Sequence, residues 1–130
     1  MSTTDLTIDT LPPLLDKREG IVLVDFWAAW CMPCSTFAPV YEKLSDEHAD
    51  CVFGKVNTEE EQHLTAGFGI ESIPTLLVFR DGILIYGEPG ILPEGALRDL
   101  VTQVKSLDMD EVRAKVAAHE AQARAGGQSS

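Results

Sequence analysis

The apolar residues of this chain fall into short blocks whose spacing alternates between that of strands and that of helices. The apolar spacing and β-branched residues predict strands at residues 6–8, 21–27, 51–56, 75–79 and 83–86. Helical spacing predicts helices at residues 11–18, 31–48, 58–67 and 93–105. The alternating order and the Asp81-Gly82 turn before the last strand predict an α/β fold. Its central mixed sheet would be flanked by helices on both faces.

The composition changes after residue 105. Residues 109–124 are rich in Ala, Arg, Lys and Glu, which favour a helix, and Val112 and Val116 form only a thin apolar stripe on it. Residues 126–130 are predicted to be disordered. We therefore expect a compact domain at residues 1–105 and a C-terminal helical extension at 106–130. The pattern leaves open whether the extension is mobile, packs on the domain or binds a partner.

Size and charge narrow the classes of function. The chain has 130 residues, which suits one domain, and a net charge of −11. An anionic surface argues against nucleic acid as a partner, because phosphates are bound by Lys and Arg. The apolar runs are too short to cross a membrane, and the N-terminal residues do not resemble a signal peptide. These features predict a cytoplasmic protein, and three cysteines in such a chain do not indicate a disulfide framework.

The most informative residues are Cys31 and Cys34, which are three positions apart at the predicted start of a helix. Such thiols lie on one side of a turn, so they suit either disulfide exchange or metal binding. The amide groups at a helix N-terminus lower the pKa of a thiol there, which predicts Cys31 as the attacking thiolate. Cys34, one turn further in, is predicted to be more buried and to resolve the mixed disulfide. A metal site would need a second pair of ligands, which the spacing of the histidines does not supply.

Two charged residues stand in or beside apolar strands. Asp25 interrupts the run 21–27, and a buried carboxyl has a raised pKa, so Asp25 is a candidate proton acceptor for Cys34. Lys55 on the neighbouring predicted strand is either its charge partner or a surface lysine. Pro74 precedes another strand, and the local sequence alone favours an ordinary trans bond there over a cis bond.

Several segments of the chain together resemble the thioredoxin family, in its order and spacing, from about residue 5 to residue 105. The matching segments are Val24-Asp25-Phe26-Trp27-Ala28-x-Trp30-Cys31-x-Pro33-Cys34, Ala38-Pro39, Lys55-Val56-Asn57, Gly69-Ile70-x-x-Ile73-Pro74-Thr75, Phe79-x-Asp81-Gly82 and Gly90.

The resemblance implies the thioredoxin fold and the reduction of protein disulfides. It implies a redox disulfide between Cys31 and Cys34, a proton relay at Asp25 beside Lys55, and a cis-proline at Pro74. The implied substrate-facing surface comprises Trp30, Met32, Ile73, Pro74, Gly90 and Ile91. No bound cofactor or metal is implied beyond the reversible disulfide. The implied partners are disulfide-containing proteins and an NADPH-dependent thioredoxin reductase, and we expect a monomer.

Three positions depart from the family pattern. Met32 stands where glycine is usual, Ser35 replaces a common basic residue, and Glu71 lies where a basic or neutral residue is frequent. The site is therefore less cationic, and we expect the pKa of Cys31 to be lowered less than in typical relatives. The alternative function is a binding module on the same fold with little reductase activity. An oxidant or isomerase would require an oxidising compartment, which the N-terminus does not indicate.

Overall fold

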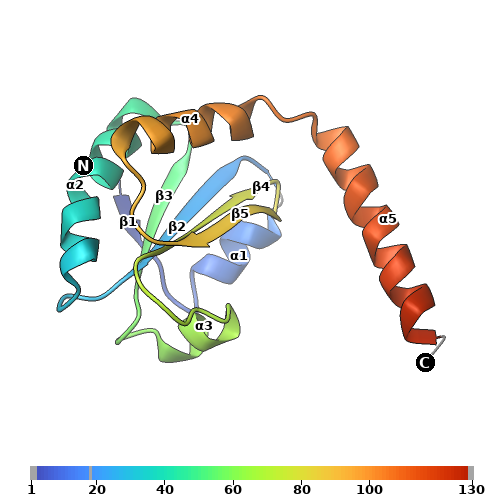
Figure 1. Cartoon of the computed structure of the whole chain (residues 1–130), viewed down its shortest axis with the longest axis horizontal. Helices are drawn as coiled ribbons and strands as arrows, with labels where there is room; N and C mark the ends of the chain where they lie inside the picture. The colour runs from blue at the N-terminus through green and yellow to red at the C-terminus, as the bar shows by residue number, and fades with distance from the viewer. Residues whose placement is uncertain (1–2, 18, 129–130) are drawn as a thin grey trace.

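A computed structural model describes the backbone of residues 3–17 and 19–128. One five-stranded sheet, in the order β1-β3-β2-β4-β5, forms its centre (Figure 1). The strands are β1 (Thr3–Asp5), β2 (Ile21–Trp27), β3 (Val52–Asn57), β4 (Thr75–Arg80) and β5 (Ile83–Pro89). β1, β3 and β2 run parallel, whereas β4 and β5 are antiparallel to their neighbours, so the predicted mixed sheet is confirmed.

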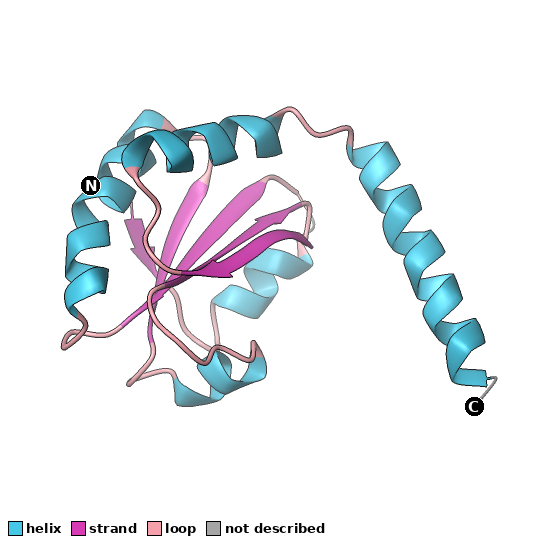
Figure 2. Cartoon of the chain, in the orientation of Figure 1, coloured by secondary structure: helices cyan, strands magenta, loops and turns pink. Residues whose placement is uncertain are grey.

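Helices cover both faces of this sheet, as Figure 2 shows. They are α1 (Leu11–Asp16), α2 (Met32–Glu47), α3 (Gln62–Gly67) and α4 (Glu94–Lys105). Successive residues of β2 point to opposite faces, so Leu23 joins the core under α2 and α4 while Val22 and Val24 join the core under α1 and α3. This two-sided burial explains why β2 is apolar at almost every position, and it makes Asp25 an exception within the strand.

Two predicted elements were placed wrongly. The first strand occupies Thr3–Asp5 rather than residues 6–8, because it pairs with β3 from Thr3 onward and Leu6 turns into the core. The helix expected from Thr58 begins at Gln62. Thr58 is instead tied to the end of β2 by its N–H, which donates to Trp27 O (2.9 Å), and the Asn57 side chain accepts from the Glu59 N–H (3.0 Å). The polar residues at the start of the segment predicted as a helix therefore build a turn.

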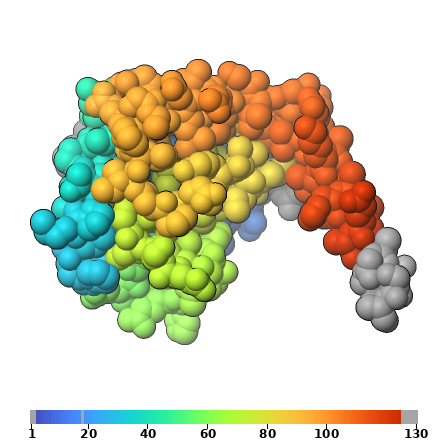
Figure 3. Space-filling view, viewed as in Figure 1, coloured from blue at the N-terminus to red at the C-terminus, as the bar shows by residue number. Residues whose placement is uncertain are grey.

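The C-terminal helix α5 (Met109–Gln128) extends away from the domain in Figure 3, and the side chains are described as far as residue 124. The expected helix is present, but its backbone continues past Gly126, where disorder was predicted; residues 129–130 lie outside the described part. The helix is joined to the domain at its start, where Met109 is buried. Arg80 Nη1 donates to the carbonyls of Val104, Lys105 and Leu107 at 2.6, 3.0 and 3.0 Å, which fixes the connection after α4.

Candidate functional site: a dithiol at the start of α2

The two cysteines of the CxxC segment are joined by a disulfide at the N-terminus of α2. Cys31 is the N-cap residue in an extended conformation, and its Sγ accepts a hydrogen bond from the Cys34 N–H (3.2 Å). The first helical turn begins with Met32 and Pro33, where a proline is tolerated because the first amide groups have no partner within the helix. The sulfur of Cys31 therefore lies at the N-terminal end of the helix and accepts one of its first N–H groups, an arrangement that stabilises a thiolate.

Both cysteines are nearly buried in this oxidised form, each with 4% of its surface exposed. The expectation that Cys34 would be the more buried of the two was wrong for this state, because the disulfide holds both sulfurs against Ala28, Trp27 and Ile73. The difference between the two thiols lies instead in their positions, with Cys31 at the helix cap and Cys34 inside the first turn.

Large apolar side chains surround the disulfide on the outside. Trp30 is 68% exposed and Met32 is 77% exposed, which is unusual for residues of this size. The Trp30 indole N–H donates a hydrogen bond to the Glu59 carboxylate. Nothing in the sequence around Glu59, which lies in the segment predicted as a helix at residues 58–67, indicates this contact. Its role depends on the turn after β3, which brings it to a residue 29 positions earlier in the chain.

The segment before β4 forms the other wall of the site. The Ile73–Pro74 peptide bond is cis, as the family resemblance implied and local sequence alone did not. Ile73 O lies 3.9 Å from Cys31 Sγ, so two segments 42 residues apart meet at the disulfide. Gly90 N–H donates to Pro74 O (2.8 Å), with Gly90 in the left-handed region at a φ of 104°. Ile91 follows with 42% exposure, so this wall also presents an apolar side chain.

Asp25 lies in the middle of β2, and only 1% of its surface is exposed. Burial raises the pKa of its carboxyl to about 7, although the positive charge of Lys55 acts in the opposite direction. Its Oδ1 has no hydrogen-bond partner among the described residues. A carboxyl that titrates near neutrality can both accept and return a proton.

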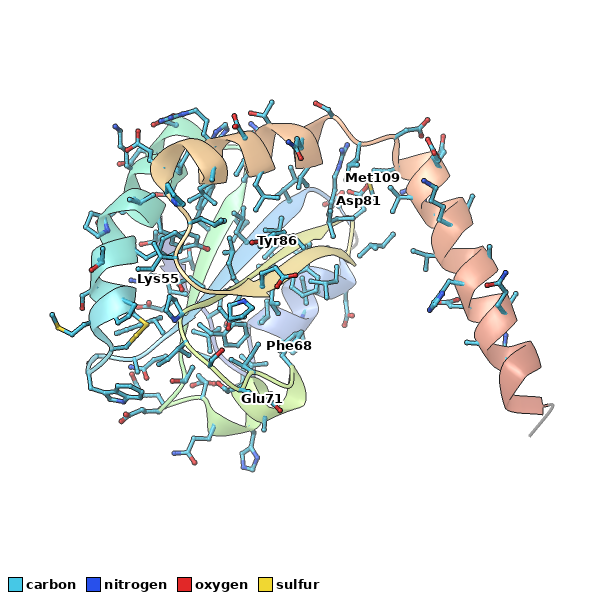
Figure 4. The ribbon with its side chains drawn as sticks, in the orientation of Figure 1. Lys55, Phe68, Glu71, Asp81, Tyr86 and Met109 are labelled. Atoms are coloured by element: carbon cyan, nitrogen blue, oxygen red, sulfur yellow. A yellow bond between two sulfur atoms is a disulfide. The ribbon has the colours of Figure 1, made fainter. Side chains whose placement is uncertain are left out.

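Lys55 is half-buried and belongs to this interior group rather than to the open surface. It pairs with Asp25 across β2 and β3, and its Nζ lies 4.8 Å from the centroid of the Trp27 ring (Figure 4 labels Lys55). A cavity of about 100 Å³ is lined by Lys55, Trp27, Cys34 and residues near them on α2. Lys55 and the second cysteine thus border one small pocket.

Within residues 3–17 and 19–128, no three His, Cys, Asp or Glu side chains gather where they could hold a metal ion. No helix among the described residues is long and apolar enough to cross a membrane. The third cysteine, Cys51, is reduced and buried, and burial raises the pKa of its thiol.

Comparisons with known proteins agree with this geometry. The sequence model of the family described as Thioredoxin matches residues 3–106. The chain is 49% identical over 122 residues to "Putative thioredoxin 2" of Streptomyces coelicolor, covering 94% of this chain and 90% of that protein. It is 44% identical over 89 residues to thioredoxin of Bacillus subtilis, covering 68% and 86% of the two chains. A solved mutant thioredoxin from Halobacterium salinarum NRC-1 superposes with a TM-score of 0.73 at 32% identity, over 82% of this chain and 93% of that one.

The fold and the disulfide at the start of α2 define a thiol–disulfide oxidoreductase of the protein-disulfide reductase class. The chain belongs to the thioredoxin family. The general substrates of this family are disulfide-containing proteins, and its general partner is a thioredoxin reductase.

Proposed function

We propose that Cys31 is the attacking thiol, Cys34 the resolving thiol and Asp25 the group that takes the proton from Cys34, with Lys55 adjusting the charge beside it. The observation that carries this assignment is the position of Cys31 at the N-cap of α2, with its Sγ accepting the Cys34 N–H. Helix amides at that point stabilise the thiolate of Cys31 once the disulfide is reduced.

The reaction then proceeds in two exchanges. The Cys31 thiolate attacks one sulfur of a substrate disulfide, a mixed disulfide forms, and the other substrate sulfur leaves as a thiolate that takes up a proton. The Cys34 thiol gives its proton to the Asp25 carboxylate and attacks Cys31 Sγ. The second substrate sulfur leaves as a thiolate, and the Cys31–Cys34 disulfide remains. Two electrons have passed to the substrate, and an NADPH-dependent reductase returns two electrons to the dithiol.

The surface that receives the substrate comprises exposed or partly exposed apolar groups around the disulfide together with the cis-proline wall. These residues are Trp30, Met32, Ile73, Pro74, Gly90 and Ile91. The backbone of Ile73 lies next to Cys31 Sγ, which suits pairing with an extended substrate segment. The same proposal assigns residues 1–105 to the catalytic domain and 106–130 to an extension, in a monomer that acts in the cytoplasm and binds no nucleic acid.

Trapping of the mixed disulfide tests the two cysteine roles. We expect wild type to reduce insulin in the presence of NADPH and a thioredoxin reductase. Cys34→Ser should accumulate a mixed disulfide with the substrate through Cys31, and Cys31→Ser should accumulate none. Trapping through Cys34 in the Cys31→Ser variant would reverse the assignment, and absence of insulin reduction by wild type would contradict the reductase function itself.

A further inference from the structure

A groove lies next to the cis-proline wall. It has a volume of about 280 Å³ and is lined by residues 68–72, by Thr75 and Leu77 of β4, and by residues 87–89 of β5. Its floor is apolar: Leu77 and Phe68 belong to the core under α1 and α3, and the Phe68 ring packs on those of Phe26 and Phe79. The floor of the groove is therefore formed by well-packed side chains of the core.

The groove is continuous with the site described above. Ser72 and Thr75, which line it, flank the Ile73–Pro74 bond, and Thr75 Oγ1 donates to Ser72 O (2.5 Å). Ile73 O lies 3.9 Å from Cys31 Sγ. A substrate segment that passes Cys31 along this wall consequently reaches the groove within two residues.

The charge of the groove is negative. Glu71 lines it, lies two residues before Ile73 and is exposed, and neither Glu71 nor Glu88 forms a hydrogen bond or ion pair with a described residue. Figure 4 shows Glu71 and Phe68 together on the segment that follows α3. Among the residues that the structure describes, no Lys or Arg lines the groove. An unpaired carboxylate beside an apolar floor favours a cation with an aliphatic stem, and Lys and Arg are the side chains of that kind.

We propose that this groove, with Glu71 as its specificity-determining residue, selects substrates that carry Lys or Arg two residues from the cysteine that Cys31 attacks. The inference rests on the proposed function and names a class of substrate for it. The position follows from the chain order, since Glu71 lies two residues before Ile73, whose O is 3.9 Å from Cys31 Sγ. A substrate segment that is extended along this wall covers about 7 Å in two residues.

The test uses short peptides with one cysteine, each oxidised to its symmetrical disulfide dimer so that both sulfurs are equivalent. Three versions carry Lys, Gln or Glu two residues on each side of the cysteine. The second-order rate constant of reduction by the pre-reduced protein is measured for each. Wild type should reduce the Lys peptide about two- to fivefold faster than the Gln peptide, the range of exposed charge pairs, and the Glu peptide more slowly than both.

Variants of Glu71 locate the effect. Glu71→Gln should bring the Lys-to-Gln ratio close to one, and Glu71→Lys should invert the order of the Lys and Glu peptides, a result that a damaged fold would not produce. Glu120→Gln on α5 is the matched control and should keep the wild-type ratio. High salt should compress the ratio, because exposed charges are screened.

The outcomes separate the two proposals. If wild type reduces none of the peptides, the proposed function fails and this inference fails with it. Equal rate constants for the three peptides, or a preference for Lys that persists in Glu71→Lys, would overturn the groove inference and leave the reductase function standing.

Discussion

Asp25 on β2 lies directly beside Lys55 on β3 in the register of the parallel pair. Two effects act in opposite directions on the protonation of Asp25. Burial raises the pKa of its carboxyl, and the charge of Lys55 lowers it. Burial is the larger effect, and the pKa is about 7. At pH values above this pKa the buried carboxyl is ionised, which lowers the free energy of unfolding. That loss of stability can be measured.

Replacement of Asp25 by Asn should stabilise the oxidised protein at alkaline pH. The pKa rises from 3.8 to about 7 on folding, so between these values the folded protein keeps a proton that the unfolded chain has released. Stability due to this residue therefore falls as the pH rises, by about 4 kcal/mol in total at 1.36 kcal/mol for each pKa unit. We expect Asp25→Asn to raise the free energy of unfolding by up to about 4 kcal/mol at pH 8 and by little at pH 4.

Urea denaturation at several pH values measures this difference. Asp99→Asn, at an exposed carboxylate on α4, is the control and should follow the wild-type profile. A gain from Asp25→Asn that is equally large at pH 4 and pH 8 would show that the effect comes from packing rather than from ionisation.

The thiol of Cys31 should titrate less far below its ordinary value than in typical relatives, because no Lys or Arg flanks it on α2. Ser35 is exposed on the first turn, where its N–H donates to Cys31 O (3.1 Å). We expect an apparent pKa of about 7 or above from the rate of alkylation of Cys31 against pH. Ser35→Lys should lower it, and Thr102→Lys on α4 should leave it in place. An apparent pKa clearly below 7 in wild type would contradict this expectation.

Replacement of Gly90 should lower stability because of its backbone conformation, and not because a larger side chain lacks room. A Cβ at Gly90 would meet no atom within 4 Å, but its φ of 104° is one that other residues rarely adopt. Gly90→Ala is expected to lower the free energy of unfolding by about 1–2 kcal/mol. Gly95→Ala is the matched control, since Gly95 has equal space within α4, and it should stabilise by about 0.5–1 kcal/mol. Equal effects of the two changes in thermal unfolding would refute the conformational argument.

Arg80 should matter for stability without taking part in the chemistry. Its Nη1 donates to three carbonyls at the end of α4 and after it, and hydrogen bonds from a charged group contribute about 1.5–3 kcal/mol. Arg80→Met is expected to lower the free energy of unfolding by about 2 kcal/mol, with insulin reduction preserved at temperatures where the variant is folded. Arg113→Met removes exposed ion pairs to Asp81 and Asp110 and should change stability little. If Arg113→Met lowered the free energy of unfolding as much as Arg80→Met, α5 would be held to the domain by the ion pairs of Arg113 rather than by Arg80.

The local sequence pattern was sufficient to predict the bounds of an element where one kind of interaction dominates that segment. The run 21–27 is apolar because both faces of β2 are covered, and the strand has the predicted bounds. The helix after Cys31 was also predicted closely, as α2 begins at Met32. The positions of β1 and α3 were wrong because they depend on partners far along the chain: β3 for Thr3 and the end of β2 for Thr58.

The candidate site shows the same division. Cys31, Cys34 and Asp25 could be selected from the sequence, because two thiols one turn apart and a carboxyl within an apolar strand each have a chemical consequence on their own. The partnership of Glu59 with Trp30 could not be predicted, since it depends on the turn that Asn57 and Thr58 build. The groove beside Glu71 likewise exists only where residues 68–72 meet β4 and β5.

By itself, the sequence determined which side chains are candidates for the chemistry and which helix start would hold the thiols, because burial pattern and helix capping act over a few neighbouring residues. The tertiary structure decided what lies around these side chains: Ile73 O beside Cys31 Sγ, the burial that raises the pKa of Asp25 with the Lys55 charge that lowers it, and the Glu71 carboxylate in the groove beside the cis-proline. These are distances between segments that lie tens of residues apart, and only the packing of the whole sheet brings them together.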